Sequence, residues 1–441
     1  MQRQQALLHA LDVEYTEPVR DPVWKHIHLS PPLLRLVDTA EFQKLNRIRQ
    51  LGPTYLVYPG ATHTRFNHSL GVFHIARRLL QQLLRHSETP QLSGEGVRAF
   101  LAAALLHDVG HFPYTHSFKT LPLTEHEQLT GRLVQSGNLA RRIRSGLGVE
   151  PKMVAAIVDE SLDDQSSEEV QLYRRLLSGS LDPDKLDYLN RDAYFCGIPY
   201  GLQDIDFALN RVVPTGYEGI AVDEAGITAV ENILFSKYLM YRAVYWHRTV
   251  RVATAMIRKA VFLALREGVI TAEDLYGLDD ELLLSRVAVG SFPPLDLIRR
   301  VGTRDLLKPV ADLPFDGSDP HHRRLEDGAY RLMLESRIAA SLRKGRNGTP
   351  RDHEVIIDLP DPVSFEAEFP IVSRGETLDF PRRSVFSGEV VTRFTEVLRR
   401  IRLILPESVA ETLPDTQRLL ENAVQDDHLQ DEHLQDDRRS R

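Results

Sequence analysis

Apolar side chains recur at three- and four-residue intervals along much of the chain, which is the spacing of one face of an α-helix. The clearest such stretches are 67–84, 125–135 and 183–195. Residues 97–106 are apolar almost all round, which predicts a helix enclosed by other helices. Residues 227–266 contain neither Gly nor Pro, so we expect one very long helix there.

The C-terminal part of the chain has a different pattern. A clear helix is expected at 330–344, and short strands are expected at 353–359 and 368–373. The segment 387–403 is expected to end in a helix. Residues 422–441 are polar and lack aromatic side chains, which favours disorder.

These patterns predict a mainly α protein with a small α+β appendage near its C-terminus. A chain of 441 residues exceeds one ordinary hydrophobic core, so we expect a large catalytic domain with appended segments. The expected regions are a helical catalytic domain at 1–270, a helical extension at 271–345, a small α+β region at 346–421 and a disordered polar tail at 422–441.

Composition narrows the class of protein. Hydrophobic residues make up 42% and charged residues 26% of the chain, as in folded soluble proteins. Lys and Arg number 54 against 62 Asp and Glu, and the formal net charge of -8 argues against a surface that wraps nucleic acid. No signal-peptide pattern and no run of about 18 apolar residues occurs, so no membrane association is expected. Cys196 is the only cysteine, so no intrachain disulfide can form and a cytoplasmic location is expected.

Eight of the 17 histidines fall in the stretch 63–126. Three predicted helices carry four candidate metal ligands: His68, His107 and Asp108 in this stretch, and Asp184 further along the chain. Two imidazoles and two carboxylates suit a divalent cation and leave positions open for water and phosphate. Adjacent side chains diverge by about 100° along a helix, so His107 and Asp108 can reach one ion only at a helix end. Taken singly, each residue could instead cap a helix or begin a turn.

Four long runs of sequence carry these residues: Gln50–Gly52, Tyr58–Val72, Leu105–His111 and Asp182–Tyr188. They resemble the HD-domain deoxynucleoside triphosphate triphosphohydrolases, over about residues 21–260. The resemblance implies an HD-domain helical bundle with one divalent metal ion, for which Mn or Mg is expected and Fe or Zn is the alternative. It also implies that metal-activated water attacks the α-phosphorus and releases a deoxynucleoside and inorganic triphosphate.

By the same resemblance, His126 is the expected general acid, with His111 as a second catalytic histidine. Imidazole suits proton transfer near neutral pH because its unperturbed pKa is about 6.5. The family commonly has an acidic residue after a His-x-Phe segment, where this chain has Lys119. Glu125, Glu127 or a water molecule could replace that acid.

A bound triphosphate needs cations and neutral hydrogen-bond donors around it. The candidates are Arg65, His111, His116, Lys185 and Lys237. Asp184, Tyr188 and Asp192 are spaced four residues apart, so they share one face of the predicted helix. That face could reach metal, sugar and phosphate together.

The resemblance further implies a pocket for deoxyribose. Tyr188 would pack against the sugar, where a 2′-hydroxyl would clash, while Gln50 and Asp192 would bind the 3′-hydroxyl, with Leu51 beside Gln50. The alternatives are a core contact for Tyr188, a surface position for Gln50 and an ion pair between Asp192 and an arginine.

On the long predicted helix, Lys237, Tyr241 and Tyr245 repeat at helical spacing. Stacking of a tyrosine on a nucleobase is chemically reasonable, although such a stripe also suits a core. Stacking tolerates every base, so the sequence does not determine a base preference.

Other functions stay open at this stage. The chain could be an HD phosphohydrolase for a monophosphate or a signalling nucleotide, or a non-catalytic nucleotide sensor. It lacks a Gly-Tyr-Pro signature after the His-Asp pair, which disfavours the cyclic-dinucleotide branch. The resemblance implies a homo-oligomer, either a tetramer or a dimer, and in some relatives activation by a nucleotide effector.

Overall fold

The computed structural model describes these parts of the chain: residues 2–162, 167–179, 181–343, 350–363, 365, 369–373 and 376–425. Contacts divide the chain into two compact units. Unit 1 consists of 1–245, 270–289 and 365–391, and unit 2 consists of 246–269, 290–364 and 392–441. Each unit combines segments that are far apart in the sequence, while the four consecutive regions expected above stay a prediction.

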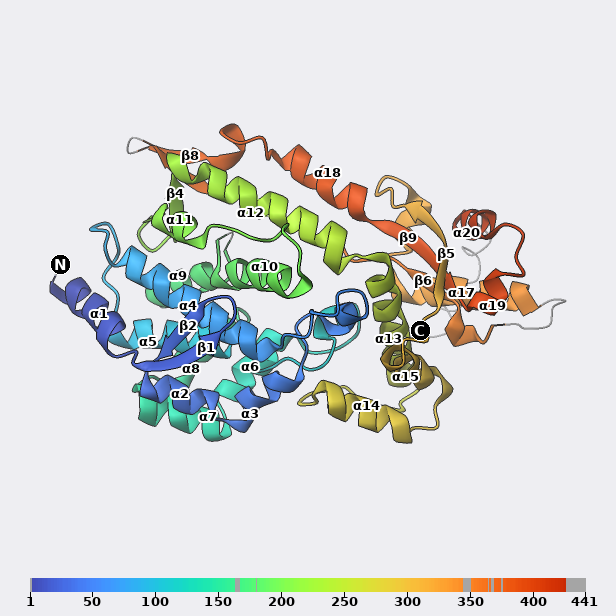
Figure 1. Cartoon of the computed structure of the whole chain (residues 1–441), viewed down its shortest axis with the longest axis horizontal. Helices are drawn as coiled ribbons and strands as arrows, with labels where there is room; N and C mark the ends of the chain where they lie inside the picture. Colours follow the sequence, from blue (N-terminus) through green and yellow to red (C-terminus); the bar gives the residue numbers. More distant parts are fainter. Residues whose placement is uncertain are drawn as a thin grey trace, which may run out of the picture. The chain divides into compact units, whose positions relative to one another are not determined.

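Helices dominate unit 1, so the predicted mainly α fold is confirmed (Figure 1). Its α-helices are α1 (Gln2–Val13), α2 (Pro31–Val37), α3 (Ala40–Gln43), α4 (Arg65–Leu83), α5 (Gly94–Leu106), α6 (His126–Val134), α7 (Gly137–Arg142), α8 (Pro151–Val158), α9 (Glu168–Leu177), α10 (Pro183–Cys196), α11 (Ile205–Asn210), α12 (Ile227–Met240) and α14 (Asp280–Val289). Short 3-10 or π segments join some of them: η1 (Lys44–Arg47), η2 (Gly52–Leu56), η3 (Thr115–Phe118), η4 (Ile143–Leu147), η5 (Glu224–Gly226), η6 (Tyr241–Tyr245) and η9 (Phe380–Arg382).

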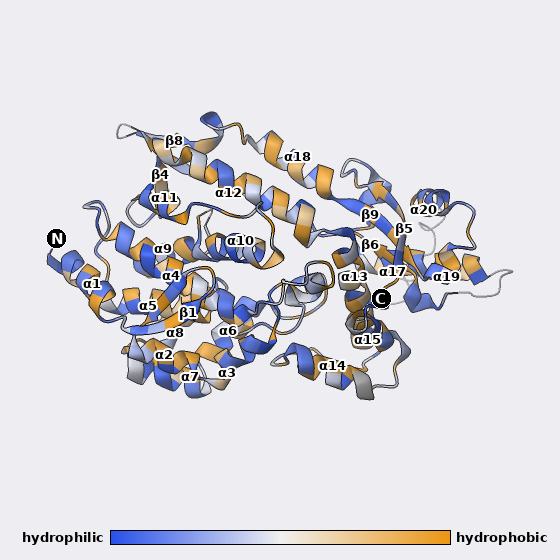
Figure 2. Ribbon diagram, in the orientation of Figure 1, coloured by the Kyte–Doolittle hydropathy of each residue, from blue (hydrophilic) through white to orange (hydrophobic). Residues whose placement is uncertain are grey.

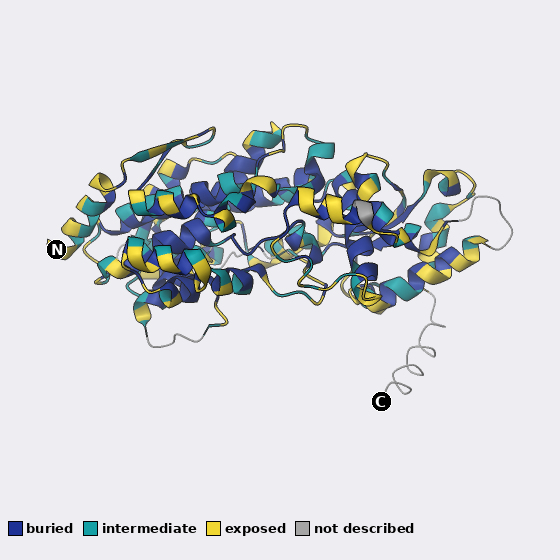
Figure 3. Cartoon of the chain, turned by 90° about the horizontal axis from the view of Figure 1, so that it is seen from below, coloured by how far each residue is buried: buried dark blue, intermediate teal, exposed yellow. Residues whose placement is uncertain are grey.

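The core of unit 1 centres on α5. This helix packs against α4 and α8, α4 also packs against α10, and α8 against α6. Nearly every residue of α5 from Val97 onward is buried, as its all-round apolar pattern predicts. Figure 2 shows hydrophobic and hydrophilic residues alternating along the surrounding helices, as in amphipathic helices. Figure 3 shows that α1 is largely exposed, and Leu11 is its one buried residue.

Two small sheets complete unit 1. β1 (Glu17–Asp21) and β2 (Lys25–Leu29) form an antiparallel hairpin. The second sheet has the order β3-β4-β7-β8. Its strands are β3 (Val212–Pro214), β4 (Ile220–Asp223), β7 (Pro370–Ser373) and β8 (Glu376–Asp379), and only the β4–β7 pair is parallel.

Unit 2 contains an antiparallel sheet with the order β5-β9-β6. Its strands are β5 (Lys308–Pro314), β6 (Ile356–Asp358) and β9 (Arg400–Leu405). Its helical segments are α13 (Arg248–Arg266), η7 (Pro293–Leu295), α15 (Asp296–Gly302), α16 (Pro320–Arg324), α17 (Gly328–Arg343), η8 (Asp352–Glu354), α19 (Glu407–Ala410) and α20 (Thr416–Val424). The predicted sheet-containing C-terminal part is confirmed, but its strands complete sheets that begin earlier in the chain.

The very long helix expected at 227–266 is interrupted, so that prediction was wrong in detail. α12 ends at Met240, the π-helical η6 (Tyr241–Tyr245) follows, and α13 begins at Arg248. The absence of Gly and Pro reports local helix propensity only. Contacts made elsewhere in the fold, such as that of Tyr245 with α10, are not visible in that pattern.

The segment 387–403 does not end in a helix. α18 (Gly388–Leu398) stops before the end of this segment, and the strand β9 begins two residues later, at Arg400. Ile401 and Leu403 are fully buried and alternate with arginines, which is the strand period of two. Of the polar tail, 426–441 lies outside the described residues, and α20 reaches Val424. Within the described residues, no helix has both the length and the apolar character that crossing a bilayer requires.

Candidate functional site

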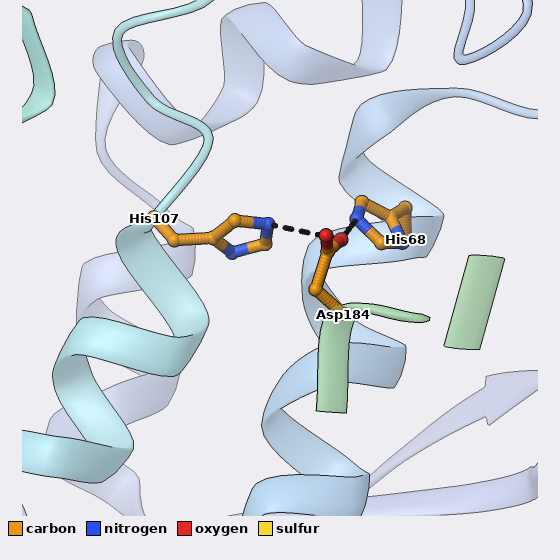
Figure 4. Close-up of side chains that lie close together, drawn as sticks. All are labelled: His68, His107 and Asp184. Carbon is orange, nitrogen blue, oxygen red and sulfur yellow. Dashed lines mark ion pairs between the residues drawn. The ribbon is translucent and has the colours of Figure 1, made fainter. Parts of the chain in front are cut away.

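The ends of three helices bring two histidines and one aspartate together (Figure 4). His68 lies in the first turn of α4, His107 follows the last residue of α5, and Asp184 is the second residue of α10. His68 Nε2 lies 2.8 Å from Asp184 Oδ1, and His107 Nε2 lies 3.9 Å from the same oxygen. Three of the four predicted metal ligands therefore converge on one point.

Local sequence sets the start of α10. The Asp182 carboxylate accepts the backbone N–H of Lys185 at 2.6 Å, and Pro183 occupies the first helical position, where no N–H is needed. Asp184 therefore lies in the first turn. Burial raises the pKa of Asp182 to about 7, against the opposing effect of Lys185.

Both imidazoles are held so that Nε2 faces Asp184. His68 Nδ1 lies 2.9 Å from Asp187 Oδ2, and His107 Nδ1 lies 3.0 Å from the Ala104 carbonyl oxygen. With Nδ1–H donating in each ring, Nε2 is left as the ligand atom, as in most protein metal sites. His107 Nε2 is buried and has no hydrogen-bond partner among the described residues. The donor set therefore fits a divalent cation.

His68 lies between two carboxylates. Burial acts to lower the pKa of His68, but hydrogen bonds to Asp184 and Asp187 raise it to about 10. A cation that binds at Nε2 must therefore compete with a firmly held proton. Metal binding at this group releases a proton.

A network behind His68 was missed in the sequence. Arg191 pairs with Asp187 at 2.8 Å and with Asp21 at 2.8 Å, and the Trp24 indole N–H donates to Asp187 at 2.5 Å. Burial acts to raise the pKa of Asp187, but Arg191 and His68 hold it well below its usual range. The available signal was the three-residue spacing from Asp184, which places Asp187 one turn further along α10.

Asp108 lies in a second group, with His111 and His126, that neighbours the group of His68, His107 and Asp184. Its Oδ1 lies 3.3 Å from His107 Nε2 and 3.2 Å from His111 Nδ1, and its Oδ2 accepts a hydrogen bond from Arg65 at 2.8 Å. Ligand atoms of Asp108, His111 and His126 lie within 4.8 Å of one another. Burial acts to raise the pKa of Asp108, but His111, His107 and Arg65 hold it well below its usual range. Asp108 is thus a carboxylate between two groups of imidazoles.

Three of the predicted histidines form a cluster in which His111 and His126 are buried and His116 is exposed. The ring centroids of His111 and His126 are 3.8 Å apart, and those of His116 and His126 are 5.3 Å apart. Burial lowers the pKa of His126 to about 3, so its ring is neutral at pH 7. Glu127 Oε2 lies 3.0 Å from His126 Nδ1, but this nitrogen has no hydrogen-bond partner among the described residues, so Glu127 lies close to the ring without fixing its orientation.

The loop after Asp108 is held by close contacts. A Cβ on Gly110 would lie 2.3 Å from the His126 carbonyl oxygen, so only glycine lets α6 approach this closely. Gly110 N–H donates to Thr130 Oγ1 at 2.9 Å, and the Lys44 ammonium donates to the Val109 carbonyl at 3.1 Å. The loop that carries the clustered histidines is therefore tied to both α6 and η1.

Further along α10, Asp192 is buried between two donors. His63 Nε2 lies 2.8 Å from Asp192 Oδ1, and the Tyr245 hydroxyl donates to Asp192 Oδ2 at 2.7 Å. The ring centroids of Tyr188 and Tyr245 are 6.4 Å apart, and those of Tyr241 and Tyr245 are 4.9 Å apart. Burial raises the pKa of Tyr245 well above its usual range, so its hydroxyl stays protonated. The structure thus brings the predicted sugar and base residues of α10 and η6 together.

The remaining predicted residues are less closely connected to these groups. The Lys185 ammonium donates to Asp182 at 3.0 Å, and the Lys237 ammonium lies 5.3 Å from the ring centroid of Phe365. Gln50 Oε1 is buried without a hydrogen-bond partner among the described residues, and Leu51 directly precedes η2. His63, which sequence reasoning passed over, proves to be a direct partner of Asp192.

Imidazoles, carboxylates and an arginine gathered at the ends of packed helices are the groups that a metal-dependent hydrolase uses. A family model described as "HD domain" matches residues 65–190, and one described as "HD associated region" matches residues 211–390. The first range contains all four predicted metal ligands. The chain belongs to the HD family of phosphohydrolases, and the resemblance seen in the sequence is confirmed at that level.

Several curated proteins are similar to this chain. Uncharacterized protein YwfO of Bacillus subtilis is 34% identical over 289 residues, which cover 60% of this chain and 64% of that protein. Uncharacterized protein MJ1154 of Methanocaldococcus jannaschii is 32% identical over 326 residues, covering 73% and 66%. Deoxynucleoside triphosphate triphosphohydrolase SAMHD1 of Danio rerio is 30% identical over 283 residues, covering 56% and 46%. The match spans less than two thirds of the length of each relative.

Two solved structures share the fold. A hypothetical protein from Aquifex aeolicus has a TM-score of 0.68 at 25% identity, covering 89% of this chain and 97% of that one. A phosphohydrolase from Bacteroides thetaiotaomicron has a TM-score of 0.68 at 21% identity, covering 88% and 99%. The second similarity concerns the fold alone.

Proposed function

We propose that this chain hydrolyses deoxynucleoside triphosphates to deoxynucleosides and inorganic triphosphate. One divalent metal ion, Mn or Mg, would be held by His68, His107, Asp108 and Asp184. The observation that carries the proposal is the convergence of His68 Nε2 and His107 Nε2 on Asp184 Oδ1, with both rings oriented from behind. A relative of this chain carries the name of that activity.

A small number of residues perform the proposed reaction. A divalent cation at this point supplies an activated water and offsets negative charge on phosphate. Arg65 and His116 provide positive charge and a hydrogen-bond donor near Asp108 and His111. As water attacks the α-phosphorus and releases a proton to solvent, the bond from that phosphorus to the 5′-oxygen breaks, and the 5′-oxygen takes a proton from His126.

His126 must first gain the proton that it delivers. Its pKa of about 3 reflects burial, which disfavours the imidazolium. The negative charge of a bound triphosphate acts in the opposite direction and raises the pKa of a neighbouring imidazole. His126 therefore becomes a proton donor when substrate is bound, with Glu127 and His111 beside it.

The test is product analysis. Metal-loaded protein is incubated with each deoxynucleoside triphosphate, alone and in mixtures, and the products are separated by ion-pair chromatography. Deoxynucleoside plus inorganic triphosphate is the expected result. A monophosphate plus pyrophosphate, turnover of another nucleotide instead, or no turnover would each overturn the proposal. Turnover that requires a mixture would indicate a nucleotide effector.

The metal assignment has its own test. His107→Ala combined with Asp108→Ala should abolish bound metal and turnover while circular dichroism stays helical, because both residues follow the end of α5. His9→Ala, an exposed histidine of α1, is the control and should retain both. Elemental analysis of protein purified without chelators distinguishes Mn or Mg from Fe or Zn.

We further propose that the protein is cytoplasmic and forms a homo-oligomer, either a tetramer or a dimer. The lone Cys196 suits a reducing compartment. Light scattering with and without deoxynucleotides gives the oligomeric state. A monomer under all these conditions would remove the assembly proposal and leave the hydrolysis proposal standing.

A further inference from the structure

Asp192 is a buried carboxylate with an unusual set of partners. It is 1% exposed, and its partners among the described residues are His63 and Tyr245 rather than an arginine. Burying a carboxylate is costly unless donors or cations compensate it. Two donors leave part of its acceptor capacity unused, because an ionised carboxylate has about four lone-pair sites.

His63 is held by a second contact besides its hydrogen bond to Asp192. It is 3% exposed, and its ring is stacked on Phe195 with the centroids 4.6 Å apart. His63 Nδ1 has no hydrogen-bond partner among the described residues, and Nε2 faces the Asp192 carboxylate, to which it donates because a carboxylate accepts. Stacking and hydrogen bond together fix the orientation of both side chains.

His63 also connects to Gln50 through the backbone. The Gln50 N–H donates to the His63 carbonyl oxygen at 3.0 Å. Gln50 Oε1 is buried and has no hydrogen-bond partner among the described residues. Gln50 and Asp192 therefore each carry an acceptor that is not fully used, and each is bonded to His63, Gln50 through its backbone and Asp192 through its side chain.

We propose that His63 is a positioning residue that fixes Asp192 to read the 3′-hydroxyl of the substrate sugar. This inference rests on the proposed function, since it names what selects the sugar at that site. The 3′-hydroxyl donates to an Asp192 oxygen whose direction His63 sets. Without His63 the carboxylate loses one of its two donors and rotates about its side-chain bonds, so that hydroxyl no longer meets a fixed acceptor.

The test compares ligands that differ in the 3′-hydroxyl alone. A 2′-deoxynucleoside triphosphate and its 2′,3′-dideoxy counterpart are assayed for turnover with wild type, His63→Phe and His63→Gln. Phe keeps the stack on Phe195 and removes the donor, whereas Gln retains an N–H donor near the position of Nε2. We expect His63→Phe to reduce the preference for the 3′-hydroxyl about tenfold, mainly through KM, and His63→Gln to restore much of it.

A control separates positioning from stability. Phe195→Leu removes the aromatic stack and retains the His63 donor, so it should lower thermal stability with a smaller change in sugar preference. If His63→Phe lowers stability yet keeps the wild-type preference for the 3′-hydroxyl, His63 is structural only and the inference is overturned.

A second readout does not depend on turnover. Calorimetric titration with analogues of the deoxy and dideoxy triphosphates in which a methylene group replaces the 5′-oxygen gives the affinity ratio directly, because the bond that hydrolysis would break is absent. Wild type that binds both analogues but hydrolyses no triphosphate would refute the proposed function, and the affinity ratio of His63→Phe would still decide the role of His63. An equal ratio in wild type and His63→Phe overturns the role of His63.

Discussion

Asp187 decides which nitrogen His68 offers to the centre. The carboxylate accepts from His68 Nδ1 and from the Arg191 guanidinium, and all three side chains are buried. A carboxylate in this position fixes the ring and raises the basicity of the ligating nitrogen. At the residue scale, the centre therefore depends on a side chain that need not touch the metal.

Asp187→Asn should lower metal affinity about 10- to 100-fold without abolishing binding, because the amide keeps its shape but loses its charge. Metal content at limiting free metal is the measurement. Asp21→Asn is the matched control, since Asp21 pairs with the same Arg191 but has no contact with His68 in the described structure. Equal loss of metal in both variants would contradict a specific role for Asp187.

His74 contributes a pH dependence of stability. Burial, with smaller effects of Arg78 and Arg77, lowers its pKa to about 4. The folded state thus binds a proton less readily than the unfolded state, whose imidazole has a pKa near 6.5. The contribution of His74 to the free energy of unfolding is fully present above pH 6.5 and is lost as the pH falls toward 4.

His74→Phe should retain the stack on Trp24 and remove that loss. Between pH 7 and 4.5 the wild type is expected to lose about 2 kcal/mol more unfolding free energy than the variant. Urea denaturation at both pH values gives the comparison. Parallel pH profiles would assign the acid sensitivity to other groups.

At the scale of elements, the approach of α4 to α10 makes the centre possible. A Cβ on Gly71 would lie 1.8 Å from Asp187 Oδ1 and 2.5 Å from the Arg191 Nη2 atom. Only a residue without a side chain lets the two helices come this close. The glycine one turn after His68 therefore serves the support of that histidine.

Gly71→Ala should displace Asp187, lower the unfolding free energy by about 1–3 kcal/mol and weaken metal binding. Gly146→Ala is the control, because its added Cβ would make only ordinary contact with Pro32 at 3.7 Å. Denaturation midpoints and metal content are measured for both. A Gly71→Ala protein with wild-type metal content would show that α10 can shift without cost.

At the scale of the whole molecule, each compact unit draws on distant parts of the chain. Unit 2 has its own buried ion pair, in which the Lys259 ammonium donates to Glu335, and Glu335 Oε1 accepts the Ile357 N–H at 2.7 Å. This pair joins α13, α17 and β6. The stability of unit 2 therefore depends on contacts made within that unit.

Lys259→Met should leave Glu335 as a buried unpaired carboxylate and destabilise unit 2 by about 3–5 kcal/mol. Limited proteolysis and urea denaturation report that loss, and metal content should be retained. Lys308→Met breaks an exposed pair with Glu407 and should change stability by less than about 1 kcal/mol. Similar effects of the two substitutions would contradict the importance of burial.

The sequence by itself determined the mainly α fold and the helices α4, α5, α6 and α10 of unit 1, and it named the residues that we propose as metal ligands. The local periodicity of apolar residues predicts helices. His68, His107 and Asp184 lie at helix ends, and local signals such as Asp182-Pro183 define such ends. The predictions that failed concern features that depend on contacts between residues far apart in the sequence. The break after Met240 and the strand at 400–405 lie where tertiary contacts override the local pattern.

Only the tertiary structure decided how the chemistry is divided. It placed Asp108 between His107 and His111, put Asp187 behind His68, and paired His63 with Asp192 across 129 positions of sequence. A sequence pattern specifies which side chains are available. Distances and hydrogen-bond partners arise from packing between elements, so no periodicity along the chain encodes them.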